Sequence, residues 1–334
     1  MKTDTMNNHS INQSRIYRSA LTLCCGIFCG FATAETKTDF SFEAGAGMEH
    51  DSNLSIQELD RTQDSGDSAF LLHADARGKV DLNEALTIKA GYRHQWKNYQ
   101  TFADFDQRTG TWSLDASYDF SALTLGASLY RANATLDDSP LLTLTLGSVY
   151  AGRLIGERVY LRGAFGQRDK DFSGNPLRDA LADVVDSDMF VFFAGARSFI
   201  SLGASWENED AVSDSLDYRG RSLRARLSHK FTLVDFDNTL QLGWRFDRRN
   251  YASEFSAVDT PLDTSLLPGQ DDALPPAPSD KRRDFRRTLE ASWELAMTPS
   301  LSLTGKVSRG NHSSPVAGAD YEETLASLML SASF

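Results

Sequence analysis

The chain ends in the segment Thr324–Phe334, TLASLMLSASF, in which two kinds of side chain alternate. Every second position belongs to a mainly apolar set, and this set consists of Ala326, Leu328, Leu330, Ala332 and Phe334. The positions between them are mostly serine. A two-residue period is typical of a β-strand that presents one face to an apolar phase. The sequence therefore predicts that the chain finishes inside a strand, on an aromatic residue.

The first 34 residues have the pattern of a secretory signal peptide. Three basic residues precede an apolar stretch at 20–31, and Ala32-Thr33-Ala34 matches an A-x-A cleavage site. The stretch is only about a dozen residues long, whereas a membrane-spanning helix needs about 20. We therefore predict a signal peptide at 1–34 and a single mature domain at 35–334.

All three cysteines, Cys24, Cys25 and Cys29, lie in the predicted signal peptide. A lipoprotein signal is the alternative, but none of the three follows the usual spacer of leucine and two small residues. A mature chain without cysteine forms no disulfides and no thiolate metal or redox site. We also expect no cofactor.

The formal net charge of the chain is -12, which argues against a nucleic-acid partner. After residue 34, no apolar run approaches the length of a membrane-spanning helix, which excludes a helical membrane protein. The mean hydropathy is negative. This is compatible with a transmembrane barrel, because its strands alternate lipid-facing apolar and lumen-facing polar residues.

Alternation of this kind recurs along the whole mature chain. Fourteen segments show it: 38–50, 67–82, 85–99, 109–120, 122–132, 140–154, 157–169, 187–198, 199–208, 217–232, 236–251, 284–297, 300–310 and 322–334. Each is long enough to cross a bilayer as a tilted strand, which takes about 9–11 residues. A miscount at the boundary near 197–201 would change the total by two.

The links between these segments alternate between short and long. Thr298-Pro299 and Val234-Asp235 are among the short ones, and 51–66 and 252–283 are among the long ones. Bacterial outer-membrane barrels have short periplasmic turns and long extracellular loops. The sequence therefore predicts an all-β fold, a transmembrane antiparallel β-barrel of about 14 strands in the cell outer membrane.

The final strand resembles the recognition signal of bacterial outer-membrane β-barrels, with Leu328, Leu330 and Phe334 as the membrane-insertion signal. This resemblance implies the barrel-assembly machinery and periplasmic chaperones as partners during biogenesis. Outer-membrane lipid and lipopolysaccharide would surround the inserted barrel.

Charged residues gather in the phase expected to face the lumen. The candidates for function are Lys89, Arg93, Arg224, Arg226, Arg245, Arg286, Glu290 and Glu294. The four arginines are expected on adjacent strands, where they would form an anion-attracting strip. A lumen with both signs of charge is either a hydrated channel or a salt-bridged plug. Tyr150 is among the aromatic residues that we assign to the lipid-facing phase.

The long link at 252–283 is rich in aspartate and proline. It is either a mobile solvated loop, a constriction folded into the mouth, a partner-binding loop or a clasp for divalent ions. No catalytic residue or metal site is predicted, because the five histidines after residue 34 are scattered and no nucleophile elbow is present. We therefore expect that the protein is not an enzyme.

Several short motifs resemble the barrel part of the surface lipoprotein assembly modifier family. They are Asp51-Ser52-Asn53, Tyr218-Arg219-Gly220-Arg221, Arg282-Arg283-Asp284 and the closing segment Tyr321–Phe334. In that family the barrel follows a periplasmic tetratricopeptide-repeat domain and helps to move lipoproteins or other proteins to the cell surface. The predicted mature chain leaves only residues 35–37 before the first strand, so we expect those repeats to be missing.

Three functions remain open from the sequence. The resemblance implies transport across the outer membrane, as export of a protein or lipoprotein client to the surface. The charged lumen favours the alternative, a passive or selective pore for small solutes. A structural or adhesive surface barrel is the third.

Overall fold

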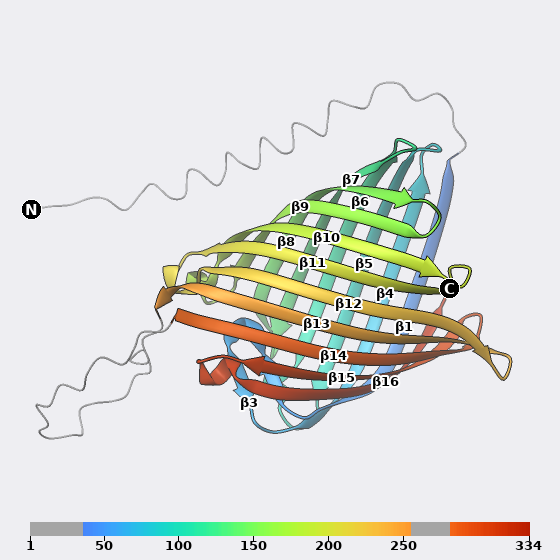
Figure 1. Ribbon diagram of the computed structural model, residues 1–334. Coiled ribbons are helices and arrows are strands. Elements are labelled where there is room, and N and C mark those ends of the chain that lie inside the picture. The colour runs from blue at the N-terminus through green and yellow to red at the C-terminus, as the bar shows by residue number, and fades with distance from the viewer. Residues whose placement is uncertain (1–35, 255–280) are drawn as a thin grey trace, which may run out of the picture.

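The computed structural model describes residues 36–254 and 281–334, which form one closed barrel of fourteen antiparallel strands (Figure 1). The barrel strands are β1 (Lys37–Asp51), β4 (Asp67–Asp81), β5 (Leu86–Tyr99), β6 (Gln107–Asp119), β7 (Thr124–Leu136), β8 (Ser139–Ile155), β9 (Val159–Phe172), β10 (Ala180–Phe193), β11 (Ser198–Ala211), β12 (Tyr218–Leu233), β13 (Phe236–Glu254), β14 (Lys281–Thr298), β15 (Leu301–Ser313) and β16 (Tyr321–Ser333). The predicted fourteen-strand antiparallel barrel is confirmed. The predicted signal peptide lies outside the described residues.

Each strand pairs with its neighbours in the sequence, and the barrel closes where β1 pairs with both β4 and β16. Two further strands, β2 (Leu54–Ile56) and β3 (Arg61–Gln63), form a separate hairpin within the link from β1 to β4. None of the helices within 36–254 and 281–334 is long and apolar enough to cross a bilayer.

The last residue takes part in this closure. The Phe42 N–H donates to the Phe334 carbonyl over 3.1 Å, and the Phe334 N–H donates to the Phe42 carbonyl over 2.8 Å. Leu328 and Leu330 of the predicted insertion signal are exposed side chains on the same face of β16 as Ala326. The pattern that ends the sequence therefore belongs to the strand that seals the barrel.

Side-chain contacts distinguish the inner face of the barrel from the outer one. Lys97 of β5 reaches Glu49 of β1 over 2.7 Å, across the intervening β4. Arg224 of β12 reaches Asp188 of β10 over 2.6 Å, across β11. Only a concave face brings side chains of non-neighbouring strands together, so this face lines the lumen. The opposite face carries exposed apolar side chains such as Leu223, Leu242, Trp244, Leu289 and Trp293.

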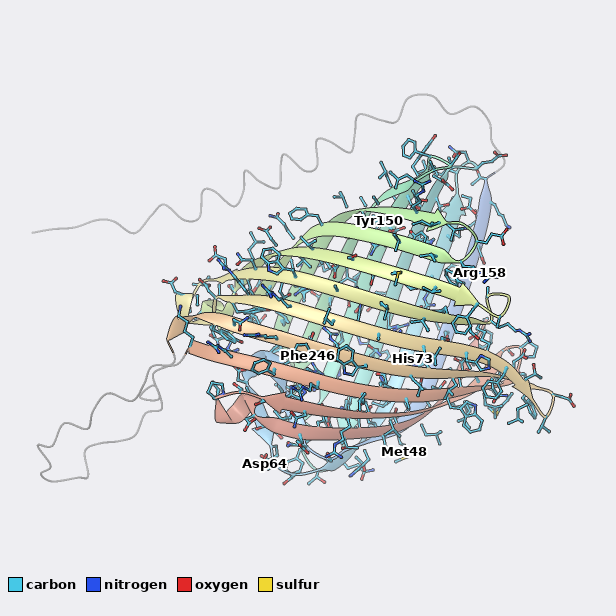
Figure 2. The ribbon with its side chains drawn as sticks, in the orientation of Figure 1. Met48, Asp64, His73, Tyr150, Arg158 and Phe246 are labelled. Carbon is cyan, nitrogen blue, oxygen red and sulfur yellow. The ribbon has the colours of Figure 1, made fainter. Side chains whose placement is uncertain are left out.

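The two ends of the barrel differ in the length of their links. One end has short turns at 82–85, 120–123, 156–158, 194–197, 234–235 and 299–300. The other end has the longer described links at 52–66, 100–106, 173–179, 212–217 and 314–320. Asp64 in the first long link and Arg158 in a short turn lie at opposite ends (Figure 2). This is the predicted alternation, apart from the link between β7 and β8.

Two predicted boundaries were wrong. Residues 133–139 were expected to form a loop, but the structure has a two-residue turn in which Asp137 and Asp138 adopt φ of 47° and 58°. Aspartate tolerates this left-handed conformation, which matches the twist of a hairpin. The strand predicted at 187–198 is β10 at 180–193, because the chain turns at Ala194–Arg197. Three residues with positive φ make that turn.

Candidate functional site at the barrel mouth

The first long link, residues 52–66, folds against the barrel wall through an apolar cluster. Leu54 and Ile56 of β2 are 0% and 4% exposed. They pack with Ala69, Tyr99 and Phe105, which come from β4, β5 and the next long link. Burial of two such side chains contributes about 1.5–3 kcal/mol each. This link, residues 52–66, is therefore docked against the barrel wall, and we call it the first loop.

Asp60 at the tip of this loop binds two arginines from separate parts of the barrel. The Arg282 Nη2 of β14 donates to the Asp60 carboxylate over 2.9 Å, and the Arg178 Nη2 donates to it over 3.1 Å. Arg178 belongs to the link after β9, and in the strand order β9 lies on the far side of the barrel from β1. The loop therefore crosses the mouth and is fastened at its tip.

These two arginines favour the ionised form of the Asp60 carboxyl group. Burial alone would raise the pKa of the Asp60 carboxyl, but the hydrogen bonds and charge of Arg282, followed by Arg178, outweigh burial and lower that pKa below its ordinary value. Asp60 also adopts a φ of 51°, which closes the short helical turn Gln57–Leu59. The carboxylate is thus ionised, and its position is fixed by the backbone as well as by its partners.

Further contacts fasten the loop along the rest of the mouth. The Arg286 Nη1 of β14 donates to the Gln57 side-chain oxygen over 2.5 Å, and the Ser55 hydroxyl donates to Glu323 of β16 over 3.4 Å. The backbone of Asp60 also packs against Gly318, where an added Cβ would lie 2.0 Å from the Asp60 carbonyl oxygen. Glycine is therefore required for this close approach.

The lumen toward the short-turn end is hollow. A cavity of about 570 Å³ lies against β1, β4, β5, β6 and β7 and is lined by charged side chains. Within this cavity, the Asp75 carboxylate forms ion pairs with Arg77 over 2.7 Å and with Arg93 over 2.6 Å. Lys89 also lines it and has no ion pair or hydrogen bond among the described residues. The cavity therefore presents both fixed ion pairs and free positive charge.

The predicted arginine strip divides into paired and unpaired members. Arg224 and Arg245 face each other across β12 and β13, with Asp188 and Asp247 as their partners at 2.6 and 2.9 Å. Arg286 binds the first loop, as described above. Arg226 shares their face and is exposed, with no ion pair or hydrogen bond to the described part of the chain. Of these four arginines, only Arg226 therefore has a charge that no described side chain neutralises.

The remaining lumen candidates lie on β14. Glu290 pairs with Lys306 of β15 over 2.8 Å, whereas Glu294 is exposed and unpaired within 36–254 and 281–334. Tyr150 was wrongly assigned to the lipid-facing phase. Its hydroxyl donates to Asp115 of β6 over 2.9 Å, across β7, which only the inner face allows.

Sequence reasoning missed the residues that close the mouth. Asp60, Gln57 and Arg178 were not predicted to have a role. The link 252–283, for which a constriction was one of four alternatives, lies largely outside the described residues. The signal that was present is the set of three apolar residues, Leu54, Ile56 and Leu59, in a loop that is otherwise polar.

Comparison with known proteins finds the fold and no family. No family model and no curated protein matches the sequence. Among solved structures, OmpT of Vibrio cholerae, expressed in the outer membrane, aligns with a TM-score of 0.52 at 8% identity, over 91% of this chain and 99% of its own. OprB of Pseudomonas putida aligns with a TM-score of 0.51 at 9% identity, over 89% and 94%. This chain has the fold of an outer-membrane β-barrel.

The long loops of the barrel are therefore extracellular and the short turns periplasmic. The first loop covers the extracellular mouth, and the charged cavity lies toward the periplasm. The resemblance to surface lipoprotein assembly modifiers stays a prediction.

Proposed function

We propose that this barrel is a gated channel for small polar or charged solutes. The proposal rests on the closure of the extracellular mouth by the first loop, where Asp60 binds Arg178 and Arg282. Beneath this closure lies a cavity lined by charged side chains. A barrel that served only as a surface scaffold would need no such closure over an open interior.

Exposure of the lumen arginines supports a hydrated path below the loop. The side chains of Arg77 and Arg245 are 60% and 58% exposed, whereas that of Arg282 at the mouth is 9% exposed. Charged groups in contact with water avoid the desolvation cost of burial. The proposed channel is therefore wet along the wall and narrow where the first loop docks.

Solute flux into proteoliposomes tests this function. The refolded full-length mature chain should admit small charged and neutral solutes slowly, and admission should fall off with solute size. Heat-modifiable migration on a gel provides the check that the barrel is folded. Vesicles containing folded barrel that stay as tight as empty vesicles, even when the first loop is destabilised, would contradict a channel.

A second candidate function is export of a protein or lipoprotein client to the cell surface. Residues that carry the family resemblance gather at the mouth. Asp51 accepts a hydrogen bond from the Tyr99 hydroxyl beside the first loop, and Arg282 joins Asp60 to Asp284. In this version a client would release the loop.

Surface display of a lipoprotein client, measured by protease shaving of intact cells with and without the barrel, tests export. Display that requires the barrel, together with tight proteoliposomes, would favour export over the solute channel. Display that is unchanged by loss of the barrel would contradict export.

A further inference from the structure

The outer face of the barrel carries a cluster of arginines on four adjacent strands. They are Arg219 and Arg221 of β12, Arg248 of β13, Arg283 and Arg287 of β14, and Arg309 of β15. The register puts all six on the face opposite the lumen, because Arg221 lies directly across from Arg248, and Phe246 directly across from Arg287. We call these six residues the outer arginine patch.

The outer arginine patch lies in the extracellular part of the barrel wall. Every member is within seven residues of the extracellular end of its strand. Toward the membrane centre, the same face continues with the exposed apolar side chains Leu223, Trp244, Leu289 and Val307. Strand residues rise about 3.3 Å each. Arginines near the extracellular strand ends, followed by apolar side chains, are the arrangement expected at the boundary between hydrocarbon and headgroups of the outer leaflet.

The charge of the patch is mostly uncompensated. Arg309 pairs with Glu322 over 3.1 Å, in an exposed contact, and Arg248 donates to Asn250 over 2.9 Å. The other four have no hydrogen bond or ion pair in the part of the chain that the structure describes. Like charges directly opposite on paired strands are destabilising. The facing pair Arg221 and Arg248 is thus a cost to the barrel unless an anion lies between them.

Elsewhere near the extracellular end, the outer face carries Arg108 of β6, which pairs with Asp138 over 2.7 Å, and Arg131 of β7. On β9 and β10, outward positions near the extracellular end carry Asp171 and Asp183, and β11 carries Asp210. The whole chain is acidic, with a net charge of -12. The outer arginine patch is therefore a denser concentration of arginine than the one on β6 and β7, in a chain that is acidic as a whole.

We propose that the outer arginine patch binds the phosphate groups of a phosphorylated glycolipid of the outer leaflet. The planar guanidinium fork matches a phosphate oxygen pair, and Arg is preferred for such contacts. The apolar side chains below the patch would contact the acyl chains of the same molecule. This combination of phosphate site above and hydrocarbon contact below selects a lipid over a free anion.

A binding titration with lipid A tests this proposal. The full-length chain in detergent is titrated with diphosphorylated lipid A, and the double variant Arg221→Gln/Arg287→Gln is compared with the wild type. Because a basic residue at an anionic membrane surface contributes roughly five-fold, the variant should bind on the order of 25-fold more weakly. The matched control is Arg226→Gln/Lys230→Gln, which removes two positive charges from the lumen face of β12 and should bind as the wild type does.

Two further arms identify the ligand. Dephosphorylated lipid A should bind much more weakly than the diphosphorylated form, and millimolar inorganic phosphate should not displace the lipid. Equal binding of wild type and Arg221→Gln/Arg287→Gln, with both variants folded, would overturn the proposal. Displacement of the lipid by inorganic phosphate at equal affinity would overturn the assignment to a lipid.

Discussion

Replacing Asp60 by asparagine should release the first loop from the extracellular mouth. Asp60→Asn keeps the shape of the side chain and removes the charge that Arg178 and Arg282 bind at 3.1 and 2.9 Å. The Asp60 side chain is 17% exposed, so its ion pairs fall between exposed pairs, worth about 0–1 kcal/mol, and buried pairs, whose disruption costs about 3–5 kcal/mol. Arg282 keeps Asp284 as a partner. We therefore expect a loss of about 2–3 kcal/mol from loop docking.

This loss predicts a measurable change in gating. At 1.4 kcal/mol per factor of ten, the ratio of open to closed states should rise roughly 30- to 150-fold. Single-channel recording in a planar bilayer measures that ratio as open probability. Asp64→Asn in the same loop is the matched control, because Asp64 is exposed and has no ion pair within the described residues. Equal open probability for the wild type and both variants would refute the role of Asp60.

The same carboxylate predicts a pH dependence. The pKa of Asp60 is lowered from its ordinary value of 3.8, so the docked loop gains stability that is complete above that value. This stability is lost as the pH falls below 3.8 and through the lower pKa of the docked state. The open probability of the wild-type barrel should therefore rise on acidification below about pH 4. Asp60→Asn, which has no carboxyl to titrate, should lack that rise.

Three further predictions test the loop and the lumen separately. Gly318→Ala should displace the loop and raise conductance, because its Cβ would lie 2.0 Å from a backbone oxygen, whereas Gly305→Ala, with nothing within 4 Å, should not. Leu54→Ala should cost about 2–5 kcal/mol of loop docking and speed proteolytic cleavage of the first loop; an unchanged cleavage rate would contradict the apolar anchor. Arg226→Gln should reduce the preference for anions over cations, measured as a reversal potential, more than Arg245→Gln does. The reverse order would show that unpaired charge does not set selectivity.

Sequence patterns were a good guide wherever one face of a strand is apolar and the other polar. The segment 236–251 was predicted as a strand from its alternation, and in β13 the structure places its apolar residues Leu240, Leu242, Trp244 and Phe246 on the outer face. Tyr150 of β8 is a residue whose side is not indicated by the alternation of apolar and polar residues. On β8, the lumen face also carries Leu144 and Leu146, so periodicity gives no reason to put Tyr150 inside.

The closure of the mouth could not be predicted because it depends on contacts between distant parts of the chain. Arg178 and Arg282 lie 118 and 222 residues from Asp60 in the sequence. No local pattern connects three single charges at such separations. These residues come together because the sheet closes into a barrel, so that strands distant in the sequence end around the same mouth. The alternation of apolar and polar residues was therefore enough to predict the barrel. The contacts at the mouth could be identified only once the three-dimensional fold was known.

The most direct test of a gated channel is single-channel conductance after removal of the first-loop hairpin. Residues 54–63 would be replaced by a short glycine-serine turn that leaves Asp51 and Asp67 at the ends of their strands. If the first loop gates a channel, the deletion should show steady, large openings and the wild type rare ones. Silence from a deletion variant that is shown to be folded would mean that the lumen is closed below the mouth, and would contradict the channel.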